Sequence, residues 1–135
     1  MGVSAAGNIA GYYTTFDGTT SGTYGFLYNG STYTTLNAPG ASGSGTKATS
    51  IYGTTVAGYY YGALGAVHGF LYNSTSSSYT TLDFSGATET YIYGIDGANV
   101  VGYYTKEAVI NYGSKSRLAV RLNNIVPVAM KRVAF

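Results

Sequence analysis

The feature that most constrains the fold is an internal repeat with a period of about 45 residues. The segment Ile9–Tyr13, "IAGYY", returns as "VAGYY" at Val56–Tyr60 and as "VVGYY" at Val100–Tyr104. The longer segment Tyr24–Leu36, "YGFLYNGSTYTTL", returns at His68–Leu82 as "HGFLYNSTSSSYTTL". The blocks keep their order while the distances between them vary by a few residues. We therefore expect the blocks to be structural elements and the variable parts to be loops.

The repeated blocks have the composition of short β-strands. They are rich in Tyr, Phe, Val, Ile and Thr, and they are bounded by Gly, Asn, Asp or Ser. The first 105 residues contain no apolar stripe at helical spacing, and glycines or β-branched residues recur every few positions, which disfavours helix. Each unit is expected to contain four strands. In the second unit these are Thr49–Gly53, Thr55–Tyr60, Gly69–Asn73 and Tyr79–Asp83.

The first long block predicts a tight hairpin. Asn29 and Gly30 form the pair preferred in a two-residue type I′ turn, because both central residues of that turn take positive φ. With this turn, Phe26 is expected to face Tyr33 across the two strands. Phe26, Tyr28 and Tyr33 are then expected on one face of the hairpin, with Leu27 and Leu36 on the other.

Together these units predict an all-β fold of tandem four-stranded antiparallel sheets. Four strands in about 45 residues is the size of one propeller blade, so the units are propeller-blade-like. A β-sandwich or a set of stacked sheets built from the same repeats is the alternative. We place the units at residues 2–49 and 50–96, with a partial unit at 97–105. A propeller takes four blades or more, so this chain is not expected to close one alone.

The sequence pattern of the units also resembles that of a known family. Along one unit the pattern is a glycine-spaced strand ending in Gly-Tyr-Tyr, then His-Gly-Phe-Leu-Tyr, then Tyr-Thr-x-Leu. Over residues 2–104 it resembles the extracellular HAF repeat of bacterial secreted and surface proteins. His68-Gly69-Phe70 matches the motif that names the family, with glycine where alanine often stands, whereas the first copy has Tyr24 at the His position. The resemblance implies an extracellular, repeat-built β protein and supplies no catalytic residues.

The basic C-terminal segment 106–135 differs from the repeats. It carries six basic residues and one acidic residue, whereas residues 1–105 carry one lysine and four acidic residues. Alternating apolar and polar positions predict a strand in it. Two uses remain open: it completes the sheet of its own chain, or it is exchanged with a neighbouring subunit by strand addition. The residues expected to make an assembly contact are Leu118, Val120, Leu122, Val126, Val128 and Phe135.

The composition favours self-association. Charged residues make up 9% of the chain, against about 25% in ordinary soluble domains, so repulsion between copies is weak. Open sheet edges with few lysines and prolines invite another strand. We therefore predict a structural extracellular or cell-surface protein whose partner is itself, as a closed ring or a filament. No disulfide is expected in a chain without cysteine, and no apolar run approaches the length of about 20 residues that a membrane span needs.

The sequence offers little for catalysis. His68 is the only histidine, so every imidazole role falls on it, but its counterpart in the other repeat is Tyr24, which favours a structural position. A single histidine without cysteine does not predict a zinc site. The acidic residues Asp17, Asp83, Glu89 and Asp96 lie at loop or strand ends, and nothing in the sequence pairs them for acid–base chemistry. We therefore predict that the chain is not an enzyme and needs no metal or cofactor.

The alternative function is a lectin-like carbohydrate-binding module. Tyrosine rings stack on the C–H faces of sugars, while hydroxyls and amides bind the sugar edges. The candidate stacking residues are the last tyrosines of the Gly-Tyr-Tyr blocks, Tyr13, Tyr60 and Tyr104, although we favour core or strand-face positions for them. Nucleic acid is not expected as a partner, because the basic residues lie in the tyrosine-poor tail.

Two sequons provide candidate glycosylation sites. Asn29-Gly30-Ser31 and Asn73-Ser74-Thr75 fall at equivalent hairpin tips, where a glycan is accessible. The turn preference of asparagine explains both positions as well, and we favour that explanation.

Overall fold

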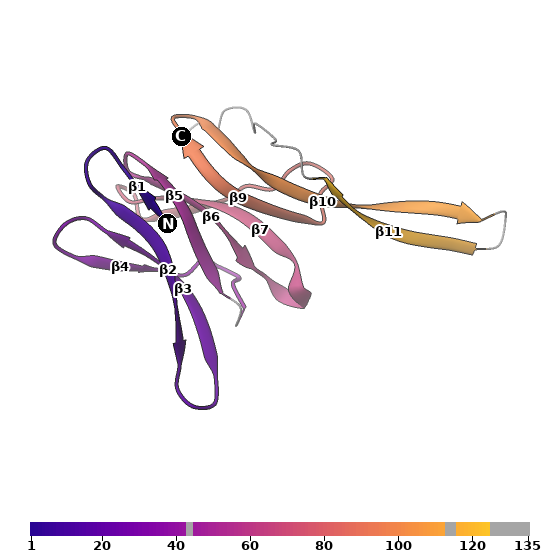
Figure 1. The fold of residues 1–135 in the computed structure, drawn as a ribbon, viewed down its shortest axis with the longest axis horizontal. Coiled ribbons are helices and arrows are strands. Elements are labelled where there is room, and N and C mark those ends of the chain that lie inside the picture. The colour runs from indigo at the N-terminus through magenta and orange to yellow at the C-terminus, as the bar shows by residue number, and fades with distance from the viewer. Residues whose placement is uncertain (43–44, 113–115, 125–135) are drawn as a thin grey trace.

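The computed structural model describes residues 1–42, 45–112 and 116–124, with side chains described as far as Lys106. Apart from one 3₁₀ turn, η1 (Ala63–Gly65), the described elements are β-strands, almost all of them in antiparallel pairs (Figure 1). The prediction of an all-β fold with antiparallel sheets is confirmed. The strands are β1 (Gly2–Val3), β2 (Ile9–Phe16), β3 (Ser21–Tyr28), β4 (Tyr33–Leu36), β5 (Thr46–Tyr52), β6 (Thr55–Tyr61), β7 (Val67–Asn73), β8 (Ser78–Thr81), β9 (Glu89–Asp96), β10 (Asn99–Tyr112) and β11 (Ser116–Asn124).

The strands form two sheets. The first has the order β1-β2-β3-β4, and the second has the order β11-β10-β9-β7-β6-β5 with β8 beside β7. One parallel residue pair, Val67 with Glu89, joins β7 to β9. The four strands predicted for the second unit are present as β5 to β8, with ends that differ from the prediction by up to three residues. The described part of the chain does not close into a barrel or a propeller.

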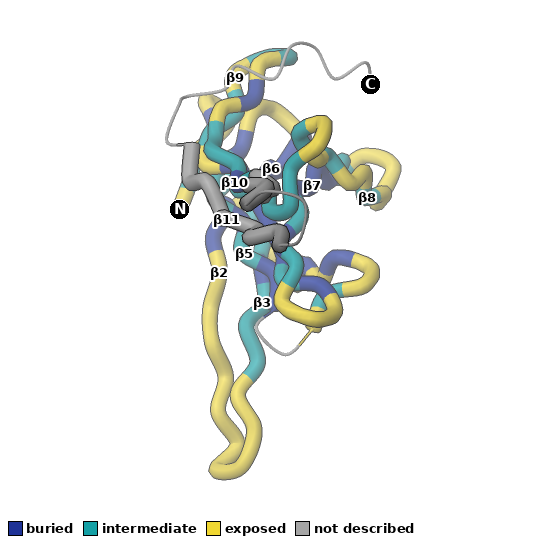
Figure 2. The backbone as a smooth tube through the Cα atoms, turned by 90° about the vertical axis from the view of Figure 1, so that its right-hand side faces the viewer, coloured by how far each residue is buried: buried dark blue, intermediate teal, exposed yellow. Residues whose placement is uncertain are grey.

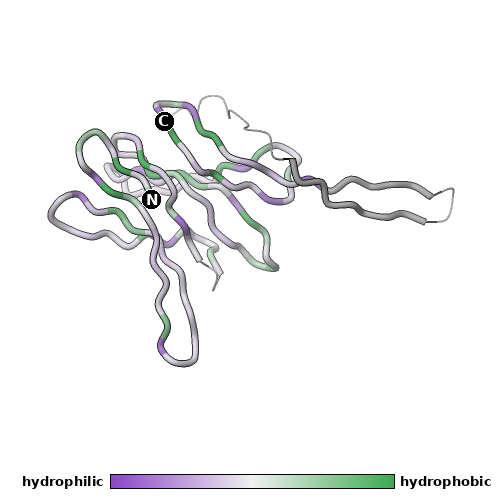
Figure 3. Tube along the Cα trace, in the orientation of Figure 1, coloured by the Kyte–Doolittle hydropathy of each residue, from purple (hydrophilic) through white to green (hydrophobic). Residues whose placement is uncertain are grey.

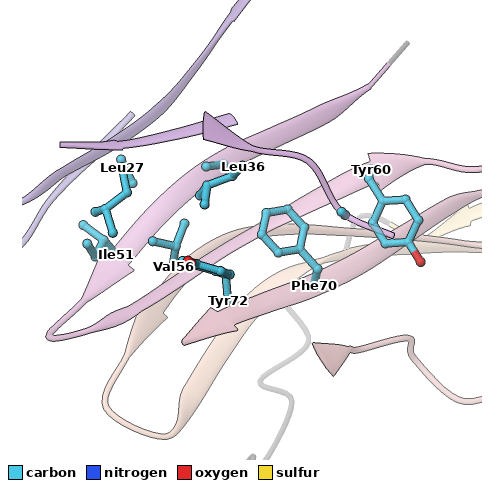
Figure 4. Packing of buried hydrophobic residues seen from close by; sticks show 10 residues of the cluster. Leu27, Leu36, Ile51, Val56, Tyr60, Phe70 and Tyr72 are labelled. Carbon is cyan, nitrogen blue, oxygen red and sulfur yellow. The ribbon is translucent and has the colours of Figure 1, made fainter. Parts of the chain in front are cut away.

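The first hydrophobic core lies between the first sheet and β5 to β8. Leu27 and Leu36 of the first sheet point toward Val56 and Phe70 of the second (Figure 4). Burial of such side chains is the main stabilising term of a small β domain, at about 25 cal/mol for each Å² of apolar surface removed from water. The members of this cluster are Ala10, Leu27, Leu36, Ala38, Ala48, Ile51, Val56, Tyr60, Phe70 and Tyr72.

A second core covers the opposite face of β6 and β7. Ala57 and Leu71 are the chain neighbours of Val56 and Phe70, and successive strand residues point to opposite faces, so they pack instead against Ile92 and Val100 of β9 and β10. The strands β5 to β8 thus form the middle of three layers, and six of the seven residues of β6 are buried. The Thr49 hydroxyl at the β5 bulge ties the layers together by donating to the Ile92 carbonyl at 2.7 Å.

The β3–β4 turn corrects one prediction. Tyr28, not Phe26, faces Tyr33, so the predicted pairing of Phe26 with Tyr33 is wrong. The Asn29 N–H donates to the Thr32 carbonyl, which puts Gly30 and its neighbour Ser31 at the tip in place of Asn29 and Gly30. Of the two residues that the predicted type I′ turn needs at positive φ, only Gly30, at φ 94°, adopts it.

The predicted faces of this hairpin are nevertheless confirmed. Moving the turn by one residue moves every cross-strand partner by two, and a shift of two preserves the side to which each residue points. Leu27 and Leu36 are buried on the inner face. On the outer face the Tyr28 and Tyr33 rings stack at 4.4 Å between centroids, and the Phe26 ring lies 5.9 Å from that of Tyr33.

Two hairpins leave the layered body. The distal part of β2–β3 is exposed (Figure 2), and its tube is mostly pale in Figure 3 because threonines, glycines and tyrosines dominate it. The long β10–β11 hairpin runs away from the body in a different direction, toward the right of Figure 1. Among the residues described, no helix has the length and apolar character required to span a membrane.

Candidate functional site

The Gly-Tyr-Tyr blocks divide their tyrosines between two environments. Adjacent strand residues point to opposite faces, so the first and second tyrosines of each block cannot share a neighbourhood. The first tyrosines are Tyr12 on β2, Tyr59 on β6 and Tyr103 on β10. They gather with further tyrosines around Lys47 of β5, the residue paired with Tyr59. This Lys47 tyrosine cluster consists of Lys47 with Tyr12, Tyr59, Tyr61, Tyr91, Tyr93 and Tyr103.

One part of the cluster is a cation held among three aromatic rings. The Lys47 Nζ atom lies 5.2 Å from the ring centroid of Tyr12, 5.9 Å from that of Tyr59 and 5.5 Å from that of Tyr61. Such a position attracts an ammonium through the negative ring face. Because Tyr12 belongs to the first sheet and Lys47 to the second, the contact joins two layers of the fold.

The remaining rings extend the cluster onto β9 and β10. The Tyr91 and Tyr103 rings stack at 4.4 Å with an angle of 16° between planes, and Tyr93 lies 5.6 Å from Tyr103 at 18°. The Tyr59 and Tyr91 rings meet edge to face, with 5.0 Å between their centroids. Tyr12 and Tyr93 are each 48% exposed, so the cluster presents ring surface to solvent.

The hydroxyl groups of the cluster are coupled. Burial raises the pKa of Tyr59, and the neighbouring Tyr93 raises it further through its charge and a side-chain hydrogen bond. The pKa of Tyr103 is raised by burial and then by a hydrogen bond and charge interaction with the same Tyr93. Both phenols therefore stay neutral, and able to donate hydrogen bonds, well beyond neutral pH.

The three tyrosines predicted to stack on sugars lie in three different surroundings. Tyr13 is 40% exposed on the outer face of the first sheet, and its hydroxyl lies 3.4 Å from the Thr35 hydroxyl. Tyr60 is buried in the first core. Tyr104 is half-buried and stacks on Phe84 at 4.0 Å. The structure does not bring these residues together, and their role in sugar binding stays a prediction.

His68 lies at the beginning of β7 and makes a polar contact. Its Nδ1 atom lies 2.8 Å from Oδ2 of Asp83, and the other carboxylate oxygen accepts the Gly69 N–H at 3.2 Å. The His68 ring also lies 5.3 Å from that of Tyr60. Both polar side chains are more than a third exposed, so the pair contributes at most about 1 kcal/mol of stability.

The two sequon asparagines both hold turns. The Asn29 side-chain oxygen accepts the backbone N–H groups of Ser31 and Thr32. The Asn73 oxygen accepts those of Thr75 and Ser76. This geometry is that of an asparagine turn, in which the side chain replaces a backbone acceptor. Glycosylation at either residue stays a prediction.

Three of the predicted assembly residues lie on β11. Leu118, Val120 and Leu122 occupy alternate positions that pair with Ile110, Ala108 and Lys106 of β10. In this chain β11 therefore pairs with its own β10. The other predicted residues, Val126, Val128 and Phe135, fall outside the described residues.

A polar cleft of about 320 Å³ lies beside the β2–β3 turn, lined mainly by hydroxyl-bearing residues together with Asp17 and Asn37. The Asp17 carboxylate accepts the Thr20 and Thr19 N–H groups at 2.8 and 2.9 Å, and these bonds lower its pKa. Over the described side chains, no three His, Cys, Asp or Glu residues group as metal ligands.

Comparison with known proteins adds no further identification. The chain matches no family model, no curated protein and no solved structure. The candidate site therefore stands on its own geometry.

Sequence reasoning missed the Lys47 tyrosine cluster, although a signal was present. The only lysine of the first 105 residues lies near the start of the strand that precedes the second Gly-Tyr-Tyr block. Pairing of those two strands places Lys47 opposite Tyr59. Nothing in the sequence indicates that Tyr12, Tyr93 and Tyr103 join this cluster, because their positions depend on how the three layers stack.

Proposed function

We propose that this chain is a structural β-repeat protein of the cell exterior that self-associates through open strand edges and its C-terminal segment, as a filament or surface-layer subunit. On this proposal each unit of about 45 residues acts as a propeller-blade-like sheet to which a neighbouring copy is added. The resemblance to the HAF repeat supports a location outside the cell, and the low content of charged residues supports self-association.

One observation carries the proposal: the outer part of the β10–β11 hairpin is a two-stranded ribbon. The strand β9 pairs with β10 only as far as Thr105, whereas β11 pairs with it from Tyr104 to Tyr112. Beyond Thr105, both outer edges of the ribbon face no other described strand. A ribbon of two strands is marginally stable in water, and its unpaired backbone groups favour addition of a further strand.

A matching open edge lies on β2. The short β1 pairs with β2 only at Ile9 and Ala10, so Gly11–Phe16 faces no described strand on that side. In the second repeat the residues equivalent to Gly11–Tyr13 are Gly58–Tyr60, and these are paired with Thr46–Ala48 of β5. We place the ribbon of one copy on the β2 edge of the next. Because the two edges differ, the contact is head-to-tail and yields a ring or a filament.

The test uses the full chain and proline variants of β11. Successive N–H groups along a strand point to opposite sides, so Ala119→Pro and Val120→Pro remove one donor toward β10 and one toward the outer edge. Both are expected to reduce assembly. The matched control is Ala63→Pro, at the exposed first residue of η1. Sedimentation velocity gives the size of the assemblies, and negative-stain electron microscopy gives their form.

Assemblies in the unsubstituted chain and in the control, with loss in at least one β11 variant, support the proposal. A monomer at the highest soluble concentration contradicts it. Equal assembly of all four proteins contradicts the role of the ribbon.

A lectin-like module is the second candidate, and the Lys47 tyrosine cluster favours it. Exposed tyrosine rings beside hydroxyl donors suit the apolar faces and polar edges of sugars. A lectin is expected to bind glycans as a discrete species, so sedimentation in the presence of glycan separates the two candidates.

A further inference from the structure

Lys47 is a cation without an acidic partner in the described region. Among the side chains of residues 1–42 and 45–106, the one close contact between a basic and an acidic group is that of His68 with Asp83, and it does not involve Lys47. The neighbours of its ammonium are the rings of Tyr12, Tyr59 and Tyr61. The attraction between two opposite charges is stronger when they are partly buried than when they are exposed, because water and salt screen partly buried charges less.

The rings next to this cation provide a surface for a flat, partly apolar ligand. Tyr12 lies on one side of Lys47 and is about half exposed. Tyr93 is also about half exposed. The buried Tyr59 lies next to both Lys47 and Tyr93, with 5.7 Å between the ring centroids of Tyr59 and Tyr93. Aromatic rings of this kind stack on the C–H faces of pyranoses, and the neutral phenols donate hydrogen bonds to ring substituents.

We propose that the Lys47 tyrosine cluster binds an acidic polysaccharide, with Lys47 pairing with a uronate carboxylate and the exposed Tyr12 and Tyr93 rings stacking on sugar rings. A carboxylated sugar joins in one repeating unit the two chemistries that the cluster offers, an anion and an apolar ring face. A nucleic acid is less suited, because its affinity depends on neutralising several phosphates and the cluster holds a single cation. The inference does not depend on self-association.

The experiment is calorimetric titration of the full chain with an oligogalacturonate and, in parallel, with its methyl ester. The ester keeps the sugar rings and removes the charge. We expect the acid to bind and the ester to bind about tenfold more weakly or not at all, as loss of a charge-assisted hydrogen bond predicts. Lys47→Gln should weaken binding of the acid by about the same factor, and Lys47→Arg should retain it.

Two further variants locate the site. Tyr93→Ala removes an exposed ring and is expected to weaken binding of both the acid and the ester. Lys106→Gln is the matched control, because Lys106 also lies over aromatic rings, at 5.7 Å from Phe84 and 5.6 Å from Tyr104, but outside the cluster. Circular dichroism establishes that each variant is folded before titration.

Three outcomes overturn the inference: no binding of the oligogalacturonate at millimolar concentration, equal binding of acid and ester, or an equal loss in Lys47→Gln and Lys106→Gln. Tighter binding of a single-stranded oligonucleotide than of the oligogalacturonate also overturns it. Since the readout is ligand binding, failure here leaves the sedimentation result on self-association unaffected.

Discussion

The two repeats have similar sequences, but their residues lie in different surroundings. The tyrosines of the first Gly-Tyr-Tyr block, Tyr12 and Tyr13, are 48% and 40% exposed, whereas Tyr59 and Tyr60 of the second are each 7% exposed. Within the described strands, β2 runs from a buried start into solvent, while β6 is buried almost throughout. The same residues therefore form a surface in one repeat and a core in the other.

The difference follows from the number of neighbouring layers. The strands β5 to β8 have the first sheet on one face and β9–β10 on the other, so both faces of β6 and β7 are covered. The first sheet is covered only on the face that carries Leu27 and Leu36. A residue on a strand becomes part of a core only when a second layer removes it from water. Position in the stack, and not local sequence, decides the role of each copy.

The sharpest test of this difference is to remove equivalent phenylalanines. Phe70 is 1% exposed between two layers, so Phe70→Ala should lower the free energy of unfolding by about 3–5 kcal/mol. Phe26, at the same place in the first repeat, is half-buried on the uncovered face, and Phe26→Ala should cost about 1 kcal/mol. Urea unfolding followed by circular dichroism gives both values. Equal losses would show that the two faces are covered alike.

Equivalent glycines give a second, smaller contrast. A methyl group at Gly58 would collide with the Lys47 backbone carbonyl, which cannot move without disturbing the β5–β6 pairing. Gly58→Ala should therefore cost about 2–3 kcal/mol. At Gly11 the nearest atom is in the Phe26 ring at 2.9 Å, and that ring can turn, so Gly11→Ala should cost less than about 1 kcal/mol. The same unfolding measurement applies, and the reverse order would contradict the open β2 edge.

The smallest effect concerns the turns that close the two hairpins. The pKa of Asp17 in the β2–β3 turn is lowered by hydrogen bonds from the Thr20 and Thr19 N–H groups. A lowered pKa means that these bonds stabilise the turn fully above the unfolded pKa, about 4, and are lost as pH falls through the lower folded value. The β6–β7 connection is closed by η1, which has no acidic residue in its first turn.

The measurement for this contrast is an NMR titration of backbone amides from neutral pH into acid. The Thr19 and Thr20 amides should shift as the Asp17 carboxyl is protonated, whereas the Ala66 amide, bonded to the Ala63 carbonyl, has no carboxylate acceptor to lose. Asp17→Asn keeps the acceptor oxygen and should abolish the pH response. Equal pH-dependent shifts of the amides in both turns would mean that the hydrogen bonds to the Asp17 carboxylate are not the cause of the response.

Several features of the fold were predictable from local chemistry. The strands β5 to β8 were anticipated because short runs of aromatic and β-branched residues end at turn-forming residues. The two faces of the β3–β4 hairpin were predicted correctly even though its turn was misplaced, because an even shift in pairing preserves them. The turn itself was missed because the Asn29 side chain captures the Ser31 and Thr32 amides, an option that the dipeptide preference does not weigh.

The candidate site was predictable only in its residue types. Tyrosines were expected to carry ligand contacts, but the sequence pointed to Tyr13, Tyr60 and Tyr104, which lie apart. The tyrosines that gather around Lys47 come from β2, β6, β9 and β10, and a repeat motif does not reveal which of two adjacent tyrosines faces a neighbouring layer.

The sequence by itself determined that this chain forms short strands, where most of them lie, and which residues of a hairpin share a face. These follow from backbone preference and from the two-residue period of a strand, which act within a few residues. The tertiary structure alone decided which copy of the repeat is buried, which edges of β2 and of the β10–β11 ribbon stay open, and that Lys47 meets tyrosines of both the first sheet and β6. The physical reason is that burial and long-range contact depend on which elements pack on a surface. The sequence of a repeated segment does not specify those elements.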